Sequence, residues 1–423
     1  MKVCVMTLGC KVNKYESDSL IYQLEKKGYI ATDKLEFADI FVVNTCAVTG
    51  EAEKKSRQMI ARCKKFNKNA KIFVCGCASQ HNSTQFLEKG VEVVMGTSGK
   101  LKILEHVDKL ANNSESICAN KENIEILPTV YQDDLFAKQS RTRAYIKIQD
   151  GCNNFCSYCI IPYLRGRSRS RSLDSIIREA ESLNDEVKEI VLTGINVTDY
   201  KIEGKPCLLT LLQRLDKLGK RLRLSSMEDT LVSEEFIEGL SKLENFCPHF
   251  HLSLQSGSDS VLKRMNRHYT ADEFKKSVKL IRKYFPLAGI TTDVIVGFPE
   301  ESDEEFEETY KFIEEVKFSQ LHIFKYSMRE GTVASKIYKD LPPQIKQLRL
   351  EKLEKLGAEL KEEFLNKNQT FKILIEEKEG EFFTGYSKNY IKCYLQSNND
   401  LTNKIVQAEK LNNFKDGVIV SLL

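Results

Sequence analysis

The chain has 423 residues, with 64 Lys and Arg against 60 Asp and Glu, a formal net charge of +4. At roughly 150 residues per domain this length predicts two or three domains, and 41% hydrophobic residues argue against disorder. The balanced charge excludes a polybasic protein, so a nucleic-acid partner would have to be held by local patches. The absence of a long apolar run and of a secretory signal predicts a cytoplasmic protein with no membrane span.

The first hundred residues alternate between strand and helix patterns. The expected strands are Lys2–Thr7, Ile40–Asn44, Ile72–Cys75 and Val91–Met95, and the expected helices are Tyr15–Lys27 and Glu51–Phe66. Alternating β and α units predict a doubly wound parallel sheet. We assign residues 1–111 to this first domain and the polar, irregular residues 112–137 to a linker.

A second alternation begins near Ala144 and gives six β/α units, fewer than the eight of a full barrel. The expected strands are Tyr145–Gln149, Ile190–Thr193, Leu222–Ser225, His251–Gln255, Thr292–Val296 and Leu321–Lys325. The expected helices are Leu173–Leu183, Leu208–Leu218, Glu234–Leu243, Asp272–Tyr284, Glu304–Val316 and Ile345–Leu365. The pattern predicts a partial, open barrel over residues 138–365.

Short β segments follow, at Phe371–Glu376, Tyr390–Leu395 and Val418–Leu422. They predict a small all-β domain over residues 366–423. The complete fold prediction is therefore α/β, with a doubly wound parallel sheet, a partial (β/α)6 barrel and a small all-β domain.

The chain has 13 cysteines, and in a reducing compartment clustered cysteines indicate metal binding or catalysis rather than disulfides. Cys152, Cys156 and Cys159 are spaced C-x3-C-x2-C, directly after the first strand of the second series. Iron–sulfur clusters usually have four thiolate ligands, so three leave one iron open to a substrate. A structural zinc loop that lacks its fourth ligand is the alternative.

Cys10, Cys46 and Cys77 each follow a predicted parallel strand. The carboxyl ends of such strands line one crevice, which suggests a second three-ligand cluster. Cys75 competes with Cys77 for this role, although strand alternation makes Cys75 part of the buried strand. A lone cysteine at a strand end is usually a small buried hydrophobe, and we treat the other six as structural or incidental: Cys4, Cys63, Cys118, Cys207, Cys247 and Cys393.

The stretch CNNFCSYCIIP resembles the signature of radical S-adenosylmethionine enzymes. Further stretches resemble, in order, successive blocks of the methylthiotransferases: TLGCKVNKYES, VVNTCAVTGEAEKKSRQ, GCASQ, RGRSRSR, LSSME, HLSLQSGSDSVLKRMNR and DVIVGFPEES. The resemblance covers nearly the whole chain. It implies an N-terminal cluster domain, a radical S-adenosylmethionine core and a C-terminal TRAM domain, in agreement with the three parts predicted from periodicity.

The resemblance also implies the cofactors, two 4Fe-4S clusters and S-adenosylmethionine. Cys152, Cys156 and Cys159 would hold the cluster that cleaves S-adenosylmethionine to a 5′-deoxyadenosyl radical, which an inert aromatic C–H bond requires. Cys10, Cys46 and Cys77 would hold the auxiliary cluster. An electron donor such as a flavodoxin or ferredoxin is implied, and we expect a monomer.

Polar or small residues at the ends of the barrel strands are candidate S-adenosylmethionine contacts, each with an alternative as ordinary turn chemistry. These candidates are Tyr158, Gly194, Gln255, Ser256, Gly297 and Glu300. Glu228 is a further candidate, either as a polar group in the site or as a solvated loop acid.

The block GCKVNKYES is similar to the branch that modifies N6-threonylcarbamoyladenosine beside the tRNA anticodon. The same chemistry on N6-isopentenyladenosine is the nearest alternative, and a non-catalytic, metal-stabilised RNA-binding protein is an alternative of another class. Arg165, Arg167, Arg169 and Arg171 lie within seven residues without an acid and are candidate tRNA contacts, unless they form a solvated charge run.

Residues 366–423 contain no arginine and only one more Lys than Asp and Glu, so we expect weak tRNA docking by this domain. Its aromatic residues include candidates for base stacking but are more often core in a small β domain. They are Phe371, Phe382, Phe383, Tyr386, Tyr390 and Tyr394.

Overall fold

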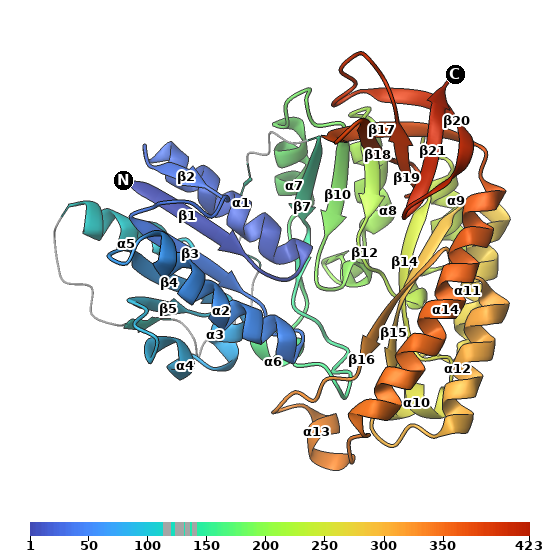
Figure 1. Ribbon diagram of the computed structural model, residues 1–423, viewed down its shortest axis with the longest axis horizontal. Coiled ribbons are helices and arrows are strands. Elements are labelled where there is room, and N and C mark those ends of the chain that lie inside the picture. The colour runs from blue at the N-terminus through green and yellow to red at the C-terminus, as the bar shows by residue number, and fades with distance from the viewer. Residues whose placement is uncertain (113–119, 123–130, 132–135, 138–141) are drawn as a thin grey trace.

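The computed structural model describes residues 1–112, 120–122, 131, 136–137 and 142–423. Three bodies follow one another along the chain: a parallel α/β sheet, an open barrel and a small closed β-barrel (Figure 1). The predicted fold class is confirmed. Cys118 lies outside the described residues.

The N-terminal sheet has the strand order β2-β1-β3-β4-β5-β6, and all neighbours are parallel. Its strands are β1 (Lys2–Thr7), β2 (Ile30–Thr32), β3 (Ile40–Thr45), β4 (Lys71–Gly76), β5 (Val93–Met95) and β6 (Asn120–Glu122). The sequence does not predict the three-residue strands β2 and β6, and β6 lies inside the range assigned to a linker. Because β2 and β3 flank β1, the chain reverses direction there and opens a crevice at the carboxyl ends of β1 and β3.

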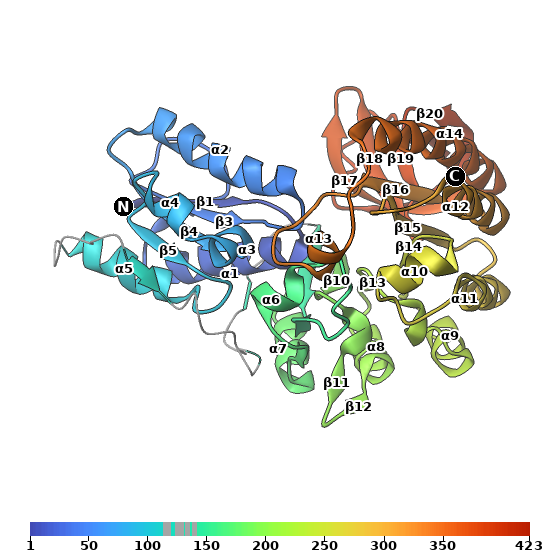
Figure 2. The same cartoon turned by 90° about the horizontal axis from the view of Figure 1, so that it is seen from below.

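Helices cover both faces of this sheet (Figure 2). α1 (Lys11–Lys26) and α5 (Lys102–Ala111) pack on one face. α2 (Gly50–Phe66), α3 (Cys77–His81) and α4 (Thr84–Leu87) pack on the other. α1 begins four residues before its predicted start, with Cys10 as its N-cap residue.

The open barrel combines two three-stranded parallel sheets, and all six predicted strands are present. The strands are β7 (Arg143–Lys147), β10 (Glu189–Thr193), β13 (Arg221–Leu224), β14 (His249–Gln255), β15 (Gly289–Val296) and β16 (Gln320–Lys325). The outer helices are α7 (Leu173–Glu181), α8 (Leu208–Asp216), α9 (Glu234–Ser241), α11 (Ala271–Tyr284), α12 (Asp303–Val316) and α14 (Pro343–Lys367). Shorter elements are β8 (Gln149–Asp150), α6 (Ile161–Arg165), β9 (Arg169–Ser170), β11 (Lys201–Ile202), β12 (Lys205–Pro206), α10 (Asp259–Arg264) and α13 (Val333–Ile337).

The C-terminal strands close into a barrel in the order β17-β18-β19-β21-β20. They are β17 (Thr370–Glu379), β18 (Phe382–Ser387), β19 (Lys392–Leu395), β20 (Ile405–Phe414) and β21 (Gly417–Leu422). The small barrel lies against the amino-terminal ends of the large-barrel strands, where Arg221 of β13 donates to the carbonyls of Tyr386 (3.1 Å) and Lys372 (2.6 Å). Gly289 of β15 permits this contact, because a Cβ there would lie 2.2 Å from the carbonyl oxygen of Asn389.

Most of the candidate stacking aromatics are occupied within the protein. Phe371, Phe383 and Tyr394 are buried, and the rings of Phe382 and Tyr394 meet edge to face. The rings of Tyr386 and Tyr390 stack on each other with centroids 4.6 Å apart, beneath the guanidinium of Arg143. These two tyrosines therefore join the two barrels.

A buried ion network joins the N-terminal sheet to the large barrel. Glu16 of α1 pairs with Lys100, with Lys147 of β7 (2.8 Å) and with Arg165 of α6 (3.0 Å). Asp150 accepts from Lys147 (2.7 Å) and Arg165 (3.1 Å). Burial opposes the charge of Glu16, but Arg165 and the two lysines hold the pKa of Glu16 well below its usual value.

Glu16→Gln is expected to lower the free energy of unfolding by about 3–5 kcal/mol at neutral pH, because three buried cations lose a carboxylate partner. Urea denaturation measures this difference. Glu36→Gln, which breaks the exposed pair of Glu36 and Lys2, is the control and is expected to cost less than about 1 kcal/mol. Equal effects of the two substitutions would contradict the role of the network.

The lowered pKa of Glu16 predicts that the stability difference between wild type and Glu16→Gln depends on pH. A carboxylate with a lowered folded pKa stabilises the protein above its unfolded value of about 4.3 and loses this contribution as pH falls toward the folded value. The difference between wild type and Glu16→Gln should therefore shrink in acid.

Candidate functional site

Three cysteines lie at the carboxyl ends of neighbouring strands in the N-terminal sheet. Cys10 precedes α1, Cys46 directly follows β3, and Cys77 begins α3 directly after β4. Burial, and then the neighbouring thiols of Cys77 and Cys10, raise the pKa of Cys46 to about 11. The structure thus brings together the three cysteines that the sequence grouped.

Two glycines allow this convergence. Gly9 has φ +94°, and a Cβ there would lie 2.6 Å from both Cβ and Sγ of Cys46. Gly76 has φ +104°, and its Cβ would lie 2.5 Å from the carbonyl oxygen of Thr45. Only glycine adopts such conformations at no steric cost, so both loops depend on it.

Cys75 points away from this group. It is buried in the core on the α1 and α5 face, among residues such as Val42 and Phe73, whereas Cys77 belongs to the opposite face. Strand β4 ends at Gly76, whose φ of +104° redirects the chain, so Cys77 lies beyond the strand and does not continue its alternation. This arrangement supports Cys77 rather than Cys75 as the third member of the group.

The second group lies on the loop between β8 and α6. The backbone N–H of Ser157 donates to the carbonyl of Met265 (2.9 Å), and the amide of Asn266 donates to the carbonyl of Phe155 (3.1 Å). Burial, and then Cys156, raise the pKa of Cys159 to about 12, and burial raises that of Cys152 to about 11. The segment after α10 therefore holds this loop around three neighbouring thiols.

A buried arginine lies beside each group. Arg165 donates through Nε to Sγ of Cys77 at 3.4 Å, and Arg267 donates through Nη1 to Sγ of Cys156 at 3.2 Å. Arg267 is not among the site residues predicted from the sequence, although it lies in the segment HLSLQSGSDSVLKRMNR, which resembles a methylthiotransferase block. Cationic donors stabilise the thiolate form, which is the form that ligates metals.

Glu228 positions Arg267. Its carboxylate lies 3.0 Å from Nη2 of Arg267 and accepts from the amide of Asn154 at 2.5 Å. Arg267 also donates to the carbonyl of Ser253 (3.3 Å). Glu228 is therefore a partly buried member of the site rather than a solvated loop acid.

The chemistry of the two donor sets fits iron–sulfur clusters, because both consist of cysteine thiols, the ligands that usually hold such clusters. Among the residues that the structure describes, no three Cys, His, Asp or Glu side chains are grouped as a site for one metal ion. The ion network beside Cys77 also has four cations (Lys100, Lys147, Arg165 and Arg169) against two carboxylates, a surplus that anionic thiolates would offset.

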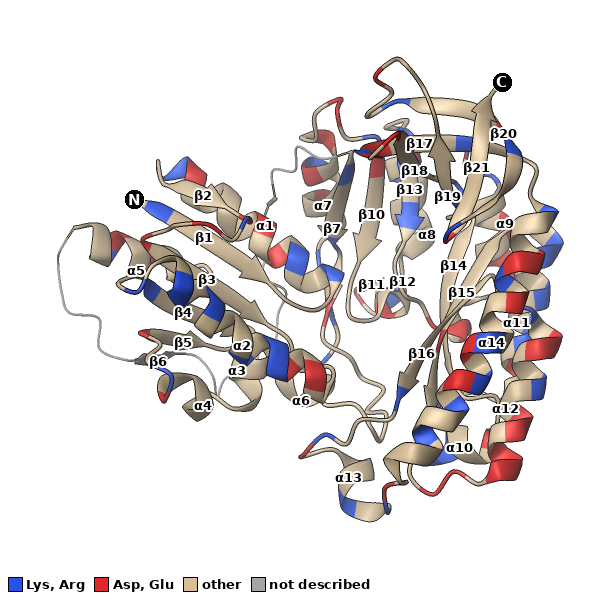
Figure 3. Ribbon diagram, viewed as in Figure 1, with Lys and Arg blue, Asp and Glu red and all other residues tan. Residues whose placement is uncertain are grey.

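The expected arginine patch is largely wrong. Arg165 and Arg171 are fully buried, and Arg171 pairs with Glu179. Arg169 pairs with Asp150 at 3.0 Å. Only Arg167 of the four is exposed, and it lies over the ring of Phe155. The acids that neutralise the run come from elsewhere in the chain, which a local charge count does not detect. On the outer helix α14 charges of both signs are mixed, whereas α12 is mainly acidic (Figure 3).

Two candidate cofactor contacts have structural roles instead. The hydroxyl of Ser256 is fully buried against Thr309 (3.0 Å). Gly297 faces α14, where a Cβ would lie 2.4 Å from Cγ of Lys346, and its N–H donates to Glu301 (2.8 Å).

The other four candidates differ in position. Tyr158 is half-buried, and burial, followed by Cys156, raises its pKa. Gly194 packs tightly on Gln149, and Gln255 ends β14 with φ +70°. Glu300 is exposed and accepts from the backbone N–H of Lys339 (3.2 Å). Of these four, only Tyr158 belongs to the cysteine loop itself, between Cys156 and Cys159.

Comparisons with known proteins agree with this geometry. Residues 146–313 match the Radical SAM superfamily, and residues 2–96 match the uncharacterized protein family UPF0004. The chain is 40% identical to the threonylcarbamoyladenosine tRNA methylthiotransferase MtaB of Bacillus subtilis, over 97% of this chain and 93% of that protein. It is 35% identical to a tRNA-2-methylthio-N(6)-dimethylallyladenosine synthase of Syntrophus aciditrophicus, over 96% and 88%.

The chain belongs to the methylthiotransferase family of radical S-adenosylmethionine enzymes. The family uses 4Fe-4S clusters and S-adenosylmethionine. The radical S-adenosylmethionine methyltransferase TsrM of Kitasatospora setae has a related fold, with a TM-score of 0.58 and 14% identity over 79% of this chain and 77% of that one. Among the described residues, no helix of this methylthiotransferase is long and apolar enough to cross a membrane.

Gly9→Ala is expected to displace Cys46 and to remove about half of the iron from the reconstituted methylthiotransferase, because one of two clusters loses a ligand. Gly28→Ala is a matched control, since Gly28 has a similar φ of +84° but no atom within 4 Å of an added Cβ. Iron and sulfide analysis measures the outcome. Full iron content in Gly9→Ala would refute the role of this close approach.

Proposed function

We propose that this enzyme inserts a methylthio group at C2 of N6-threonylcarbamoyladenosine next to the tRNA anticodon, which yields 2-methylthio-N6-threonylcarbamoyladenosine. The name of the Bacillus subtilis relative supports this substrate. The same chemistry on N6-isopentenyladenosine is the second candidate, because relatives named for dimethylallyladenosine are 35% identical to this chain.

We assign one cluster to Cys152, Cys156 and Cys159 and the auxiliary cluster to Cys10, Cys46 and Cys77. When bound, the clusters and S-adenosylmethionine supply the radical chemistry and the sulfur that substitution of an aromatic C–H bond requires. The protein holds and orients the thiols, and it buries Cys46, Cys77 and Cys156 while Cys10 stays exposed. Arg267 and Arg165 place one positive charge beside each group.

One observation carries the proposal. α6 begins at Ile161, two residues after Cys159, and ends at Arg165, whose Nε lies 3.4 Å from Sγ of Cys77. Five helical residues span about 7.5 Å. One short helix and one side chain thus connect the two thiol groups, as expected for an enzyme in which both act on a single base.

Other parts of the proposal follow from this assignment. We propose domains at residues 1–111, 138–365 and 366–423, with residues 112–137 between the first two. The enzyme would act as a cytoplasmic monomer on tRNA, with a flavodoxin or ferredoxin as electron donor. Tyr158 and Gln255 remain our candidates for S-adenosylmethionine contact, together with Gly194 and Glu300.

Nucleoside analysis of tRNA from cells with and without the gene tests the substrate. We expect the loss of 2-methylthio-N6-threonylcarbamoyladenosine and the accumulation of its unthiolated precursor. Loss of the methylthio-isopentenyl nucleoside with the threonylcarbamoyl product intact would overturn the assignment. Purified protein that holds zinc and no iron would instead indicate a non-catalytic RNA-binding protein.

Cysteine variants should separate the two sites. Cys156→Ala is expected to lose one cluster and all cleavage of S-adenosylmethionine, whereas Cys46→Ala should lose the other cluster and keep some cleavage. Cys75→Ala is the control and should keep both clusters. Anaerobic iron analysis and 5′-deoxyadenosine formation measure these effects, and equal loss from both sites in both variants would contradict independent clusters.

A further inference from the structure

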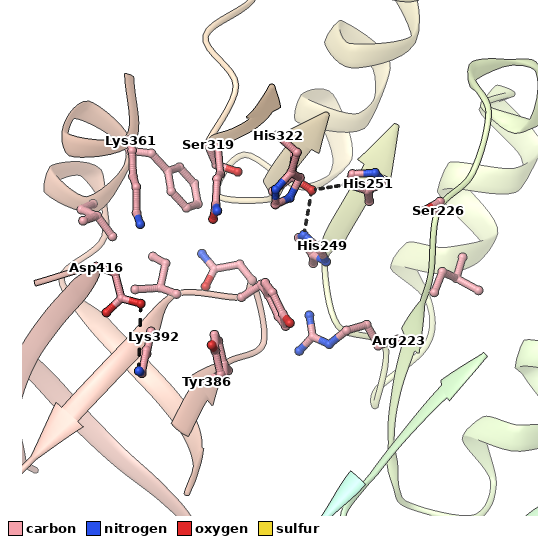
Figure 4. A pocket seen from close by; sticks show the side chains of 18 of the residues that line it. Arg223, Ser226, His249, His251, Ser319, His322, Lys361, Tyr386, Lys392 and Asp416 are labelled. Carbon is pink, nitrogen blue, oxygen red and sulfur yellow. Dashed lines mark hydrogen bonds and ion pairs between the residues drawn. The ribbon is translucent and has the colours of Figure 1, made fainter. Parts of the chain in front are cut away.

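A cavity of about 390 Å³ lies where the large barrel, the small barrel and α1 meet. Its volume is within the usual range of about 300–1,000 Å³ for small-ligand sites. Cationic and imidazole side chains dominate its polar lining: Lys11, Arg223, His249, His251, His322 and Lys361. Figure 4 shows that Lys361 from α14, His249 from β14 and Tyr386 from the small barrel extend toward a common space.

Two of these cations form no direct ion pair. Arg223 pairs with Glu189 at 2.8 Å, whereas neither the exposed Lys11 nor the half-buried Lys361 forms a hydrogen bond or ion pair with a described residue. Asp416 also lines the cavity, but its carboxylate accepts from the hydroxyl of Tyr394 and lies 4.0 Å from Nζ of Lys392. Asp416 is close enough to Lys361 to interact with it electrostatically, and His251 lies 3.2 Å from Asp293, so acids offset only part of the positive charge in this lining.

A buried imidazole in the same lining has an unpaired ring nitrogen. His249 is only 7% exposed, and its Nδ1 has no hydrogen-bond partner among the described residues. Burial first, and Arg223 next, hold the pKa of His249 well below its usual value. Its Nε2 shares the hydroxyl of Thr291 with Nδ1 of His251, at 3.2 and 2.9 Å. A buried polar atom without a partner, next to free cations, indicates a place for a polar, anionic ligand.

Neighbours along the chain connect the cavity with both thiol groups, although none of the six cysteines lines it. Lys11 directly follows Cys10 in the chain. On the other side, His251 is two residues, about 6.6 Å, along β14 from Ser253, whose carbonyl accepts from Arg267 at 3.3 Å. Arg267 in turn lies 3.2 Å from Sγ of Cys156. A group attached to a base between the two sites would reach this space.

We propose that this cavity binds the carboxylate of the threonylcarbamoyl group, with Lys361 as a specificity-determining cation; this inference rests on the proposed function. Enzymes that modify a base draw it into a pocket, while the backbone phosphates stay on the surface. The negative charge that reaches an interior cavity is therefore the carboxylate of the base. An isopentenyl group would leave Lys361 and His249 without a partner, and such sites discriminate strongly against the analogue that lacks the polar group.

The binding of two RNA hairpins to the wild type and to Lys361 variants tests the proposal. The reconstituted holoenzyme, without S-adenosylmethionine, is titrated with two anticodon hairpins, one with N6-threonylcarbamoyladenosine and one whose carboxylate is a primary amide. The wild type should bind the carboxylate hairpin about tenfold more tightly, as expected for one hydrogen-bonded charge. Lys361→Gln should abolish most of this preference, and Lys361→Arg should retain part of it.

Lys355→Gln is the matched control, since Lys355 is exposed on the same helix and does not line the cavity. It should keep the tenfold preference. A preference that survives in Lys361→Gln, or a wild type without any preference, would overturn the proposal. Equal weakening of both hairpins by Lys361→Gln would also overturn it and would indicate a phosphate contact.

The proposed function is judged separately. It fails if the wild type, supplied with S-adenosylmethionine and reductant, forms no methylthio product from the threonylcarbamoyl hairpin. The hairpin binding measurements test the role of the cavity whether or not the enzyme forms this product, because they require no turnover.

Discussion

The pairing of the buried Arg165 guanidinium is the constraint on which the arrangement of the two thiol groups depends. A buried charge is tolerated only when it is fully paired. Arg165 meets this requirement with Glu16, Asn13 and Asp150, and with Sγ of Cys77. Its partners come from the N-terminal sheet domain and from the large barrel. Because α6 joins it to the cysteine loop, pairing this one side chain also sets the distance between the two groups.

The same network explains why the site suits anionic clusters. Burial raises the pKa values of Cys46, Cys152 and Cys159, so the protein alone favours neutral thiols there. Metal binding replaces these protons, and the cations Arg165 and Arg267 then lie next to negatively charged thiolates. A surplus of buried cations is costly in the free protein but becomes favourable once the thiols are deprotonated. Stability is thus linked to cofactor loading.

The small C-terminal barrel closes the large barrel at the amino-terminal ends of its strands. Arg143 lies over the stacked rings of Tyr386 and Tyr390, and His249 stacks on Tyr390 from the other side, with ring centroids 4.5 Å apart. These contacts occupy aromatic surface that stacking on RNA bases would require. The domain contributes walls to the cationic cavity, so its influence on the substrate would come from inside the barrel as well as from its surface.

The sequence by itself determined the order of the three bodies and the six grouped cysteines, because apolar periodicity and cysteine spacing are local properties. All six strands of the large barrel are confirmed, whereas β2, β18 and β20 carry too little local pattern to be predicted. Only the tertiary structure decided the roles of the arginines. Arg165 and Arg171 look like a basic patch because their acidic partners lie outside the run. Arg165 pairs with Glu16 of α1, and Arg171 pairs with Glu179 of α7. Burial and ion pairing depend on such non-local partners, which folding alone brings together.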